Sequence, residues 1–250
     1  MDDIPRASFD PAGLRYRVVA ERGGRPSWVV VLCHGYGAPG SDLVGLAPAL
    51  KRVSAQIDKE VRFIFPEAPL SLGNFGYGEE ARAWWPLDVN RFAAVSQRGS
   101  DEGLRLLRHE LPVELEAARR TLIALVEEVA RDAGVPLSRM VLGGFSQGAM
   151  LATDVALRLR EAPAALVAFS GTLIAEAEWR AQAPSRLGLP TLLTHGREDP
   201  ILPYANAVAL RDLLQEAGWD VRFVPFPGGH AIPVEALRGC AELLARLIGV

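Results

Sequence analysis

Short runs of β-branched and other apolar residues alternate with longer segments of helical periodicity along most of this 250-residue chain. Such an alternation is typical of a mostly parallel central sheet with helices on both faces. The predicted strands cover residues 16–20, 28–33, 61–65, 140–145, 165–169, 191–194 and 221–225. We therefore expect an α/β protein in which residues 1–250 form a single domain, since α/β domains of this length are common.

The first two predicted strands, residues 16–20 and 28–33, are separated only by the turn-rich sequence ERGGRPS. A short connection of this kind favours an antiparallel hairpin, whereas strands separated by helices run parallel. The sequence therefore predicts an N-terminal antiparallel hairpin at the start of an otherwise parallel sheet.

Helical periodicity is clearest where apolar residues recur at spacings of three and four. Turn and cap signals add further helices after the later strands, one of them ending before Gly218 and one following Pro233. The predicted helices cover residues 43–57, 115–129, 147–160, 205–217 and 234–248.

One long connection, from Pro69 to about Glu110, contains glycines, the pair Trp84 and Trp85, Pro86 and mixed charges, with little regular periodicity. Long irregular connections in compact domains are usually functional. We expect residues 69–110 to form an irregular, lid-like insertion that arches over one end of the sheet. A surface excursion without a role is the alternative.

The segment Gly144–Gly148 reads G-x-S-x-G and lies between a predicted strand and a predicted helix. A strand that turns abruptly into a helix holds the central serine in a strained bend, and the flanking glycines allow neighbouring backbone to pass close by. Ser146 is therefore the candidate nucleophile, presented at the carboxyl end of its strand. The alternative is a tight turn with an inert serine.

A serine nucleophile needs a histidine base and an acid that fixes the tautomer of the imidazole. In α/β-hydrolases the order along the chain is serine, acid, histidine, and only His195 and His230 follow Ser146. His230 lies after the last predicted strand, which is the expected place for the base. His195 closes the strand at residues 191–194, and we expect it to be structural and bonded to backbone.

Two adjacent carboxylates, Glu198 and Asp199, are candidates for the acid, because they follow a predicted strand and precede His230. Asp199 is preferred, since a short acidic side chain before Pro200 suits an orienting role. Glu198 is interpreted as solvated. An aspartate that only caps its own loop is the alternative for Asp199.

Backbone amides usually stabilise the oxyanion of an acyl-transfer reaction. One donor is expected to be the N–H of Gln147, directly after the nucleophile. The other is expected from the glycine-containing turn His34–Gly37, where we nominate the N–H of Tyr36 and expect His34 to brace the loop. A plain glycine turn is the alternative.

Charge and motifs exclude several classes of partner and cofactor. The net charge is −3 and the arginines are scattered among acids, so no nucleic-acid partner is expected. The N-terminus has no apolar leader and no stretch is long enough to span a membrane, which predicts a cytoplasmic protein without an integral membrane segment. We find no metal-ligand spacing and no dinucleotide or P-loop motif, so neither a metal nor a cofactor is expected.

Three further residues are interpreted without a catalytic role. Cys33 and Cys240 read as small buried residues, because two cysteines form no disulfide framework. His109 lies among charges and reads as a surface histidine.

Several segments together resemble the phospholipase/carboxylesterase family, which includes acyl-protein thioesterases: Gly143–Gly148, His195-Gly196 with Asp199, Gly229-His230, and His34-Gly35. Arg82–Trp85 is similar to the Arg-Ala-Trp stretch that lies beside the acyl pocket in that family. The resemblance implies an α/β-hydrolase fold, an esterase or thioesterase activity, and a pocket lined by Trp84 and Trp85. Core packing is the alternative for the two tryptophans. The chain departs from the family pattern at Ala149 and in its long, charged insertion.

These features predict a serine hydrolase that cleaves small-molecule carboxylic esters or thioesters without a cofactor. Two alternatives stay open: a non-catalytic protein of the same fold that binds a small ligand, and a hydrolase of peptide, lactone or carbon–carbon bonds. The sequence does not fix the oligomeric state and leaves a homodimer open.

Overall fold

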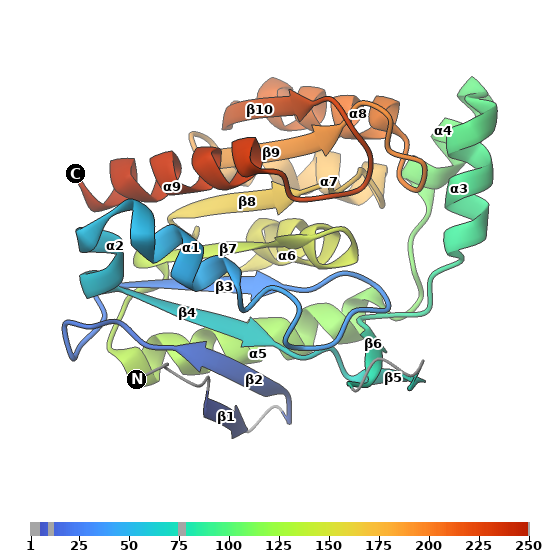
Figure 1. Cartoon of the computed structure of the whole chain (residues 1–250). Coiled ribbons are helices and arrows are strands. Elements are labelled where there is room, and N and C mark those ends of the chain that lie inside the picture. The colour runs from blue at the N-terminus through green and yellow to red at the C-terminus, as the bar shows by residue number, and fades with distance from the viewer. Residues whose placement is uncertain (1–5, 10–12, 75–78, 250) are drawn as a thin grey trace.

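A computed structural model describes residues 6–9, 13–74 and 79–249 and has an eight-stranded sheet at its centre (Figure 1). The strand order is β1-β2-β4-β3-β7-β8-β9-β10, and neighbours from β4 to β10 pair in parallel. The predicted α/β fold class is confirmed. The strands are β1 (Arg6–Phe9), β2 (Arg15–Val19), β3 (Trp28–Cys33), β4 (Val61–Pro66), β7 (Met140–Phe145), β8 (Ala165–Phe169), β9 (Pro190–Gly196) and β10 (Asp220–Phe226).

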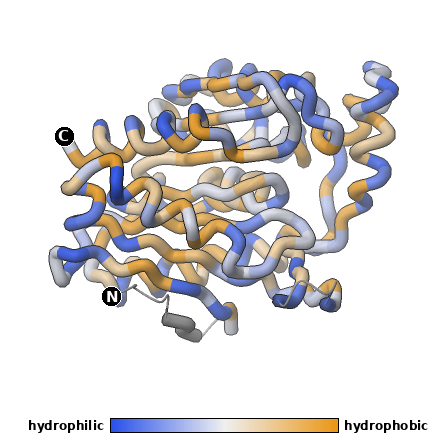
Figure 2. Tube along the Cα trace, viewed as in Figure 1, coloured by the Kyte–Doolittle hydropathy of each residue, from blue (hydrophilic) through white to orange (hydrophobic). Residues whose placement is uncertain are grey.

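Helices cover the sheet on both faces, and the central strands are apolar on both sides for that reason. In β3, Val29 and Val31 belong to one core cluster, while Val30 and Leu32 belong to the other. Figure 2 shows hydrophobic stretches running along these central strands. The first core packs against α5 (Leu115–Ala133), α6 (Gln147–Arg158), α7 (Glu176–Gln182) and α8 (Tyr204–Glu216), and the second against α1 (Leu46–Val53), α2 (Ala55–Glu60) and α9 (Val234–Ile248).

The N-terminal antiparallel hairpin is present, but different strands form it. β1 pairs with β2, which in turn pairs antiparallel with β4, so that β4 lies between β2 and β3. The predicted pairing of residues 16–20 with residues 28–33 is therefore wrong. The physical reason is that β3 is buried along both faces and lies inside the sheet between two parallel strands, so β4 takes the position beside β3 that the hairpin strand was expected to fill.

The predicted helix at residues 43–57 is divided into α1 and α2. Ser54 has an extended backbone (φ −146°, ψ 127°) between them, and its side chain accepts a hydrogen bond from the Gln56 N–H. A serine that caps a new helix competes with continuation of the preceding one. The apolar period continues across the break because both helices cover the same core.

The insertion at residues 69–110 is not irregular, and that prediction is wrong for most of its described part. It contains a two-stranded hairpin, β5 (Leu70–Gly73) with β6 (Ala81–Ala83), followed by the helices α3 (Val89–Arg98) and α4 (Asp101–His109). Asp88 caps α3 and Ser100 caps α4 through their side chains. These capping residues are the sequence signal for the two helices.

The helices of the insertion lie beyond the carboxyl ends of the parallel strands (Figure 1). The Ser96 hydroxyl in α3 donates to the Asp199 backbone carbonyl at 2.9 Å, and the Asn206 amide in α8 donates to the Leu104 carbonyl in α4 at 3.1 Å. These bonds attach the insertion to the loop that follows β9 and to helix α8.

In the part of the chain that the structure describes, we find no helix with both the length and the apolar character needed to cross a membrane.

Candidate active site

Ser146 occupies the bend between β7 and α6 with φ 54° and ψ −119°. A residue with a Cβ in such a conformation stores strain of about 1–3 kcal/mol, which the surrounding structure must hold. A Cβ on Gly144 would lie 2.5 Å from the Cys33 carbonyl oxygen, and one on Gly148 would lie 2.1 Å from it. The backbone at the end of β3 therefore requires both glycines of the motif.

His230 and Asp199 are directly hydrogen bonded. The His230 Nδ1–H donates to Asp199 Oδ2 at 2.7 Å, while Asp199 Oδ1 accepts the N–H groups of Ile201 and Leu202, each at 2.9 Å. The Asp199 side chain is fully buried, whereas that of His230 is 12% exposed. The carboxylate is thus fixed by a turn of its own loop and aimed at the imidazole.

Electrostatics favour the ionised form of Asp199. Burial by itself raises the pKa of this carboxyl, but the hydrogen bond and charge of His230 and the two amides of the turn outweigh burial. The pKa of Asp199 therefore lies below its ordinary value, and the group is a carboxylate at neutral pH.

Glu198 makes a different contact from that of its neighbour. Its exposed side chain accepts a hydrogen bond from the Gly228 N–H, and its own N–H donates to the Gly228 carbonyl at 3.0 Å. Of the two carboxylates that the sequence offered, Asp199 is the one bonded to His230, and Glu198 fixes the loop that carries His230.

The imidazole of His230 lies against the residue that precedes Ser146, since the ring centroids of His230 and Phe145 are 4.7 Å apart. The Ser170 hydroxyl at the end of β8 donates to the Ala231 carbonyl at 2.9 Å and holds the loop from the other side. The structure thus brings Ser146, Asp199 and His230 to the same edge of the sheet, at the ends of β7, β9 and β10.

The loop after β3 passes directly over Ser146. A Cβ on Gly35 would lie 3.2 Å from the Phe145 ring and 3.3 Å from the Ser146 Cβ. The next residue, Tyr36, therefore follows a point where the loop contacts the nucleophile. On the other side, Gln147 is the first residue of α6, where backbone N–H groups lack an acceptor within the helix. Both nominated oxyanion donors therefore belong to segments that adjoin Ser146.

The His34 imidazole braces this loop. Its Nδ1–H donates to the Gly35 carbonyl at 2.8 Å, and its Nε2 accepts the Ala68 N–H at 3.1 Å. The loop is also paired to the insertion, because the Gly37 N–H donates to the Arg82 carbonyl at 2.8 Å and the Arg82 N–H donates to the Ala38 carbonyl at 3.2 Å. Residues 34–38 are thus held from two sides.

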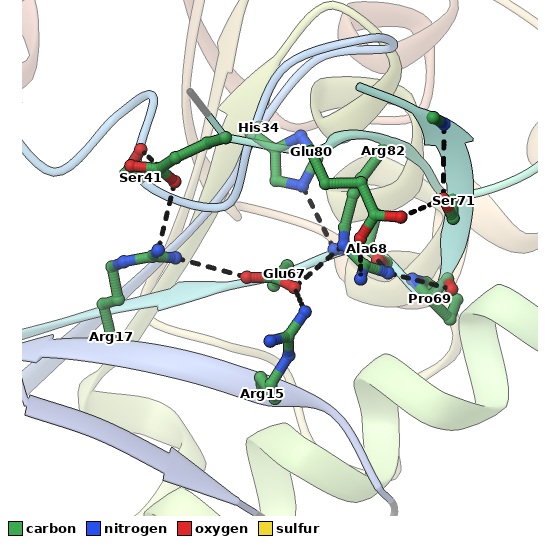
Figure 3. A network of polar contacts seen from close by, with 12 residues as sticks. Arg15, Arg17, His34, Ser41, Glu67, Ala68, Pro69, Ser71, Glu80 and Arg82 are labelled. Carbon is green, nitrogen blue, oxygen red and sulfur yellow. Dashed lines mark hydrogen bonds and ion pairs between the residues drawn. The ribbon is translucent and has the colours of Figure 1, made fainter. Parts of the chain in front are cut away.

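A cluster of charges on Glu67 supports the same loop (Figure 3). This nearly buried carboxylate, at the end of β4, pairs with Arg15 and Arg17 of β2 and with the Arg82 Nε at 2.9 Å. Arg82 also donates to the carbonyl of Pro69 at 3.2 Å. Sequence reasoning missed this cluster, since its members lie far apart in the chain and show no common motif.

Trp84 and Trp85 are both buried in the core, at 3% and 1% exposed. The Gln147 side chain binds their backbone, accepting from the Trp84 N–H at 3.0 Å and donating to the Trp85 carbonyl at 2.8 Å. The Trp84 indole N–H donates to the His34 carbonyl at 2.9 Å. Both rings therefore lie in the core, and their role in lining a substrate pocket stays a prediction.

Acidification from pH 7 to pH 5 is expected to destabilise the fold through His34. Burial lowers the pKa of this imidazole to about 4, whereas in the unfolded chain the pKa is about 6.5. Between these values the unfolded chain binds a proton that the folded chain does not, so at pH 5 the free energy of unfolding falls by about 2 kcal/mol.

Urea unfolding of the wild type and of His34→Gln at pH 7 and pH 5 measures this effect. A glutamine oxygen can accept the Ala68 N–H without titrating, so the variant should lose about 2 kcal/mol less than the wild type on acidification. Equal losses in both proteins would show that His34 is not the source.

The other histidines and the cysteines lie as the sequence suggested. His195 is fully buried with Nε2 3.0 Å from the Leu202 carbonyl, and the side chain of His109 is 56% exposed. Cys33 and Cys240 are free and buried, and burial raises the pKa of Cys240 to about 12, which keeps it a thiol. Within residues 6–9, 13–74 and 79–249, no group of three or more His, Cys, Asp or Glu side chains is arranged to hold a metal ion.

Comparison with known proteins gives a consistent result. A sequence model of the phospholipase/carboxylesterase family matches residues 14–248. Acyl-protein thioesterase 1 of Neurospora crassa is 30% identical over 226 residues, which are 88% of this chain and 86% of that protein. The corresponding protein of Gibberella zeae is 29% identical over 213 residues, which are 82% of this chain and 85% of that protein.

Solved structures show the same fold. The crystal structure of esterase PE8 has a TM-score of 0.73 and 29% identity, and the match covers 92% of this chain and 97% of that chain. A carboxylesterase from Mesorhizobium loti, at 18% identity, has a TM-score of 0.70 and covers 96% of this chain and 98% of its own. The chain has the α/β-hydrolase fold and belongs to the phospholipase/carboxylesterase family.

Proposed function

We propose that this protein is a serine hydrolase that cleaves carboxylic esters or thioesters, with Ser146 as nucleophile, His230 as base and Asp199 as orienting acid. The observation that carries the proposal is the 2.7 Å bond from His230 Nδ1 to Asp199 beside a serine in a strained strand-to-helix bend. Because Nδ1 carries the proton of the neutral ring, Nε2 is the nitrogen that can accept one.

The reaction proceeds in two acyl transfers. Ser146 Oγ attacks the carbonyl carbon while His230 Nε2 takes the hydroxyl proton, and the oxyanion accepts hydrogen bonds from the N–H groups of Tyr36 and Gln147. The imidazolium, stabilised by Asp199, then protonates the leaving alcohol or thiol. Water, deprotonated by His230 Nε2, then attacks the acyl-serine carbonyl. As the carboxylic acid is released, the imidazolium returns this proton to Ser146 Oγ, so that water is the only co-reactant.

The names of the similar proteins support the substrate class, and one contact beside the nucleophile supports where the acyl group binds. The relatives from Neurospora crassa and Gibberella zeae carry the name acyl-protein thioesterase 1, and the structural neighbour PE8 is an esterase. Gln147, beside the nucleophile, binds the backbone of Trp84 and Trp85. We place the acyl group of a small-molecule ester or thioester beside this segment of the insertion.

A fluorophosphonate probe and a substrate panel test the proposal together. The native protein should be labelled at Ser146 and should hydrolyse p-nitrophenyl esters and acyl thioesters of graded chain length. Matched p-nitroanilides should turn over at least about 100-fold more slowly, since the amine is the poorer leaving group and about 2.7 kcal/mol of barrier gives that ratio.

The two alternatives predict other outcomes. A non-catalytic protein that only binds a small ligand would stay unlabelled at Ser146 and turn over no member of the panel. A peptide hydrolase would cleave p-nitroanilides at a rate well above that of its Ser146→Ala variant, whereas an ester or thioester hydrolase would leave them close to that background rate. The serine–histidine–aspartate arrangement favours the ester or thioester hydrolase over the binding protein.

A further inference from the structure

A second imidazole, that of His195 at the end of β9, adjoins the acid of the proposed triad. Its Nε2 lies 3.0 Å from the Leu202 carbonyl oxygen and 3.3 Å from Asp199 Oδ2. Both neighbours are hydrogen-bond acceptors, so Nε2 is the nitrogen that carries the proton. Asp199 Oδ2 is also the atom that receives the His230 Nδ1–H.

His195 carries a single N–H at neutral pH. Its side chain is fully buried, and burial lowers the pKa of the imidazole despite the bond to Leu202 and the charge of Asp199. The charged and ring groups that face it are the Asp199 carboxylate, His230 and the Tyr204 ring, whose centroid is 6.2 Å away. A neutral imidazole adds a donor beside Asp199 without adding a competing charge.

The Asp199–Leu202 turn connects the two imidazoles. The Leu202 N–H donates to Asp199 Oδ1, while the Leu202 carbonyl accepts from His195. The residue that orients the carboxylate is therefore itself held by His195. Rotation of Asp199 away from His230 would require this turn to open.

We propose that His195 is a positioning residue of the triad: its Nε2–H holds the Asp199–Leu202 turn and faces the carboxylate oxygen that His230 uses. The inference rests on the proposed function, and it assigns His195 no contact with substrate, because its fully buried side chain points at Leu202 and Asp199. His195 acts through Asp199, and Asp199 acts through His230.

Three substitutions test this role. In His195→Gln the side-chain amide nitrogen can reach the place of Nε2, whereas in His195→Asn the same amide is one methylene too short. His195→Leu fills the space without a donor. Per folded molecule, the Asn and Leu variants should lower kcat for a p-nitrophenyl ester by about tenfold or more, with KM within about twofold of the wild type. Displacement of a catalytic group weakens binding of the transition state more than it weakens binding of the substrate.

The Gln variant should retain kcat within about threefold, since it restores the donor to Leu202. Folded protein is isolated by gel filtration and compared with the wild type by circular dichroism. Unchanged kcat in folded Asn or Leu variants, or an equal tenfold loss in the Gln variant, would overturn the inference. A tenfold slower Gln variant would contradict the role even if the Asn and Leu variants did not fold.

The wild type and Ser146→Ala separate this inference from the proposed function. A wild type without turnover of any ester or thioester would overturn both. An active wild type that depends on Ser146, together with His195 variants of normal kcat, would overturn only the positioning role.

Discussion

Replacing Ser146 by alanine is expected to lower kcat for p-nitrophenyl ester hydrolysis by a factor on the order of 10⁶, equivalent to about 8 kcal/mol of transition-state stabilisation. The methyl group cannot form the acyl-enzyme, while the N–H groups around the bend remain. The Ser146 side chain makes no capping hydrogen bond to α6, so the fold should be little affected. Steady-state kinetics and a thermal melt measure the two effects.

Ser170→Ala is a matched control, because Ser170 also ends a parallel strand, is buried and has a positive φ of 46°. Its hydroxyl donates to Ala231 in the His230 loop, so a loss of kcat within about tenfold is expected, far from that of Ser146→Ala. Near-normal hydrolysis by Ser146→Ala would remove Ser146 as the nucleophile.

Asp199→Asn is expected to lower kcat/KM by about 10⁴. The amides of Ile201 and Leu202 both donate to Oδ1, so the oxygen of the new amide must take that position and its NH₂ group must face His230. The imidazole then accepts on Nδ1 and carries its proton on Nε2, where it cannot act as a base toward Ser146. Ester hydrolysis at saturating and limiting substrate measures the loss.

Glu198→Gln is the matched control for Asp199→Asn, since it neutralises the adjacent carboxylate. A glutamine oxygen can still accept the Gly228 N–H, so kcat/KM should stay within about threefold of the wild type. If Glu198→Gln were the damaging substitution and Asp199→Asn the mild one, the assignment of the acid would move to Glu198.

The central strands and the last helix could be predicted from sequence to the residue. β3, β7, β8 and α9 have the bounds that the apolar runs gave, since each run is local and ends at a turn or cap signal. The partner of β2 could not be predicted in this way. β2 pairs with β4 because β4 occupies the position next to β3. Which strand occupies that position depends on the arrangement of the whole sheet.

The insertion shows a second limit of sequence patterns. α3 and α4 are short and each buries a single large apolar residue, Phe92 and Leu107 respectively. Both helices are amphipathic, but polar and charged residues make up at least half of each, so the apolar face is easily missed in this segment. The capping residues Asp88 and Ser100, which mark where each helix begins, are the clearer sequence signal for these helices.

In the candidate site, chain order and strand ends were enough to select Ser146, Asp199 and His230 for testing. The contacts around them depend on residues that no motif joins. The Glu67 cluster gathers β2, the end of β4 and Arg82 of β6, and the contact of His195 with Asp199 depends on the turn that follows β9. The direction of a side chain within a turn depends on tertiary packing and cannot be predicted from the hydrophobic periodicity of the sequence.

The side chain of Gln147 determines where substitutions could change the acyl preference of this protein without changing its turnover. The Gln147 side chain is hydrogen bonded to the backbone of Trp84 and Trp85. The residue that follows the nucleophile and this segment of the insertion are therefore expected to move together. Changes at residues 82–85 should alter turnover and acyl preference together, whereas changes within α3 and α4, joined to the core elsewhere, leave that contact intact. Directed evolution of substrate range in this protein should therefore begin at positions of α3 and α4 other than Ser96, whose hydroxyl binds the Asp199 carbonyl.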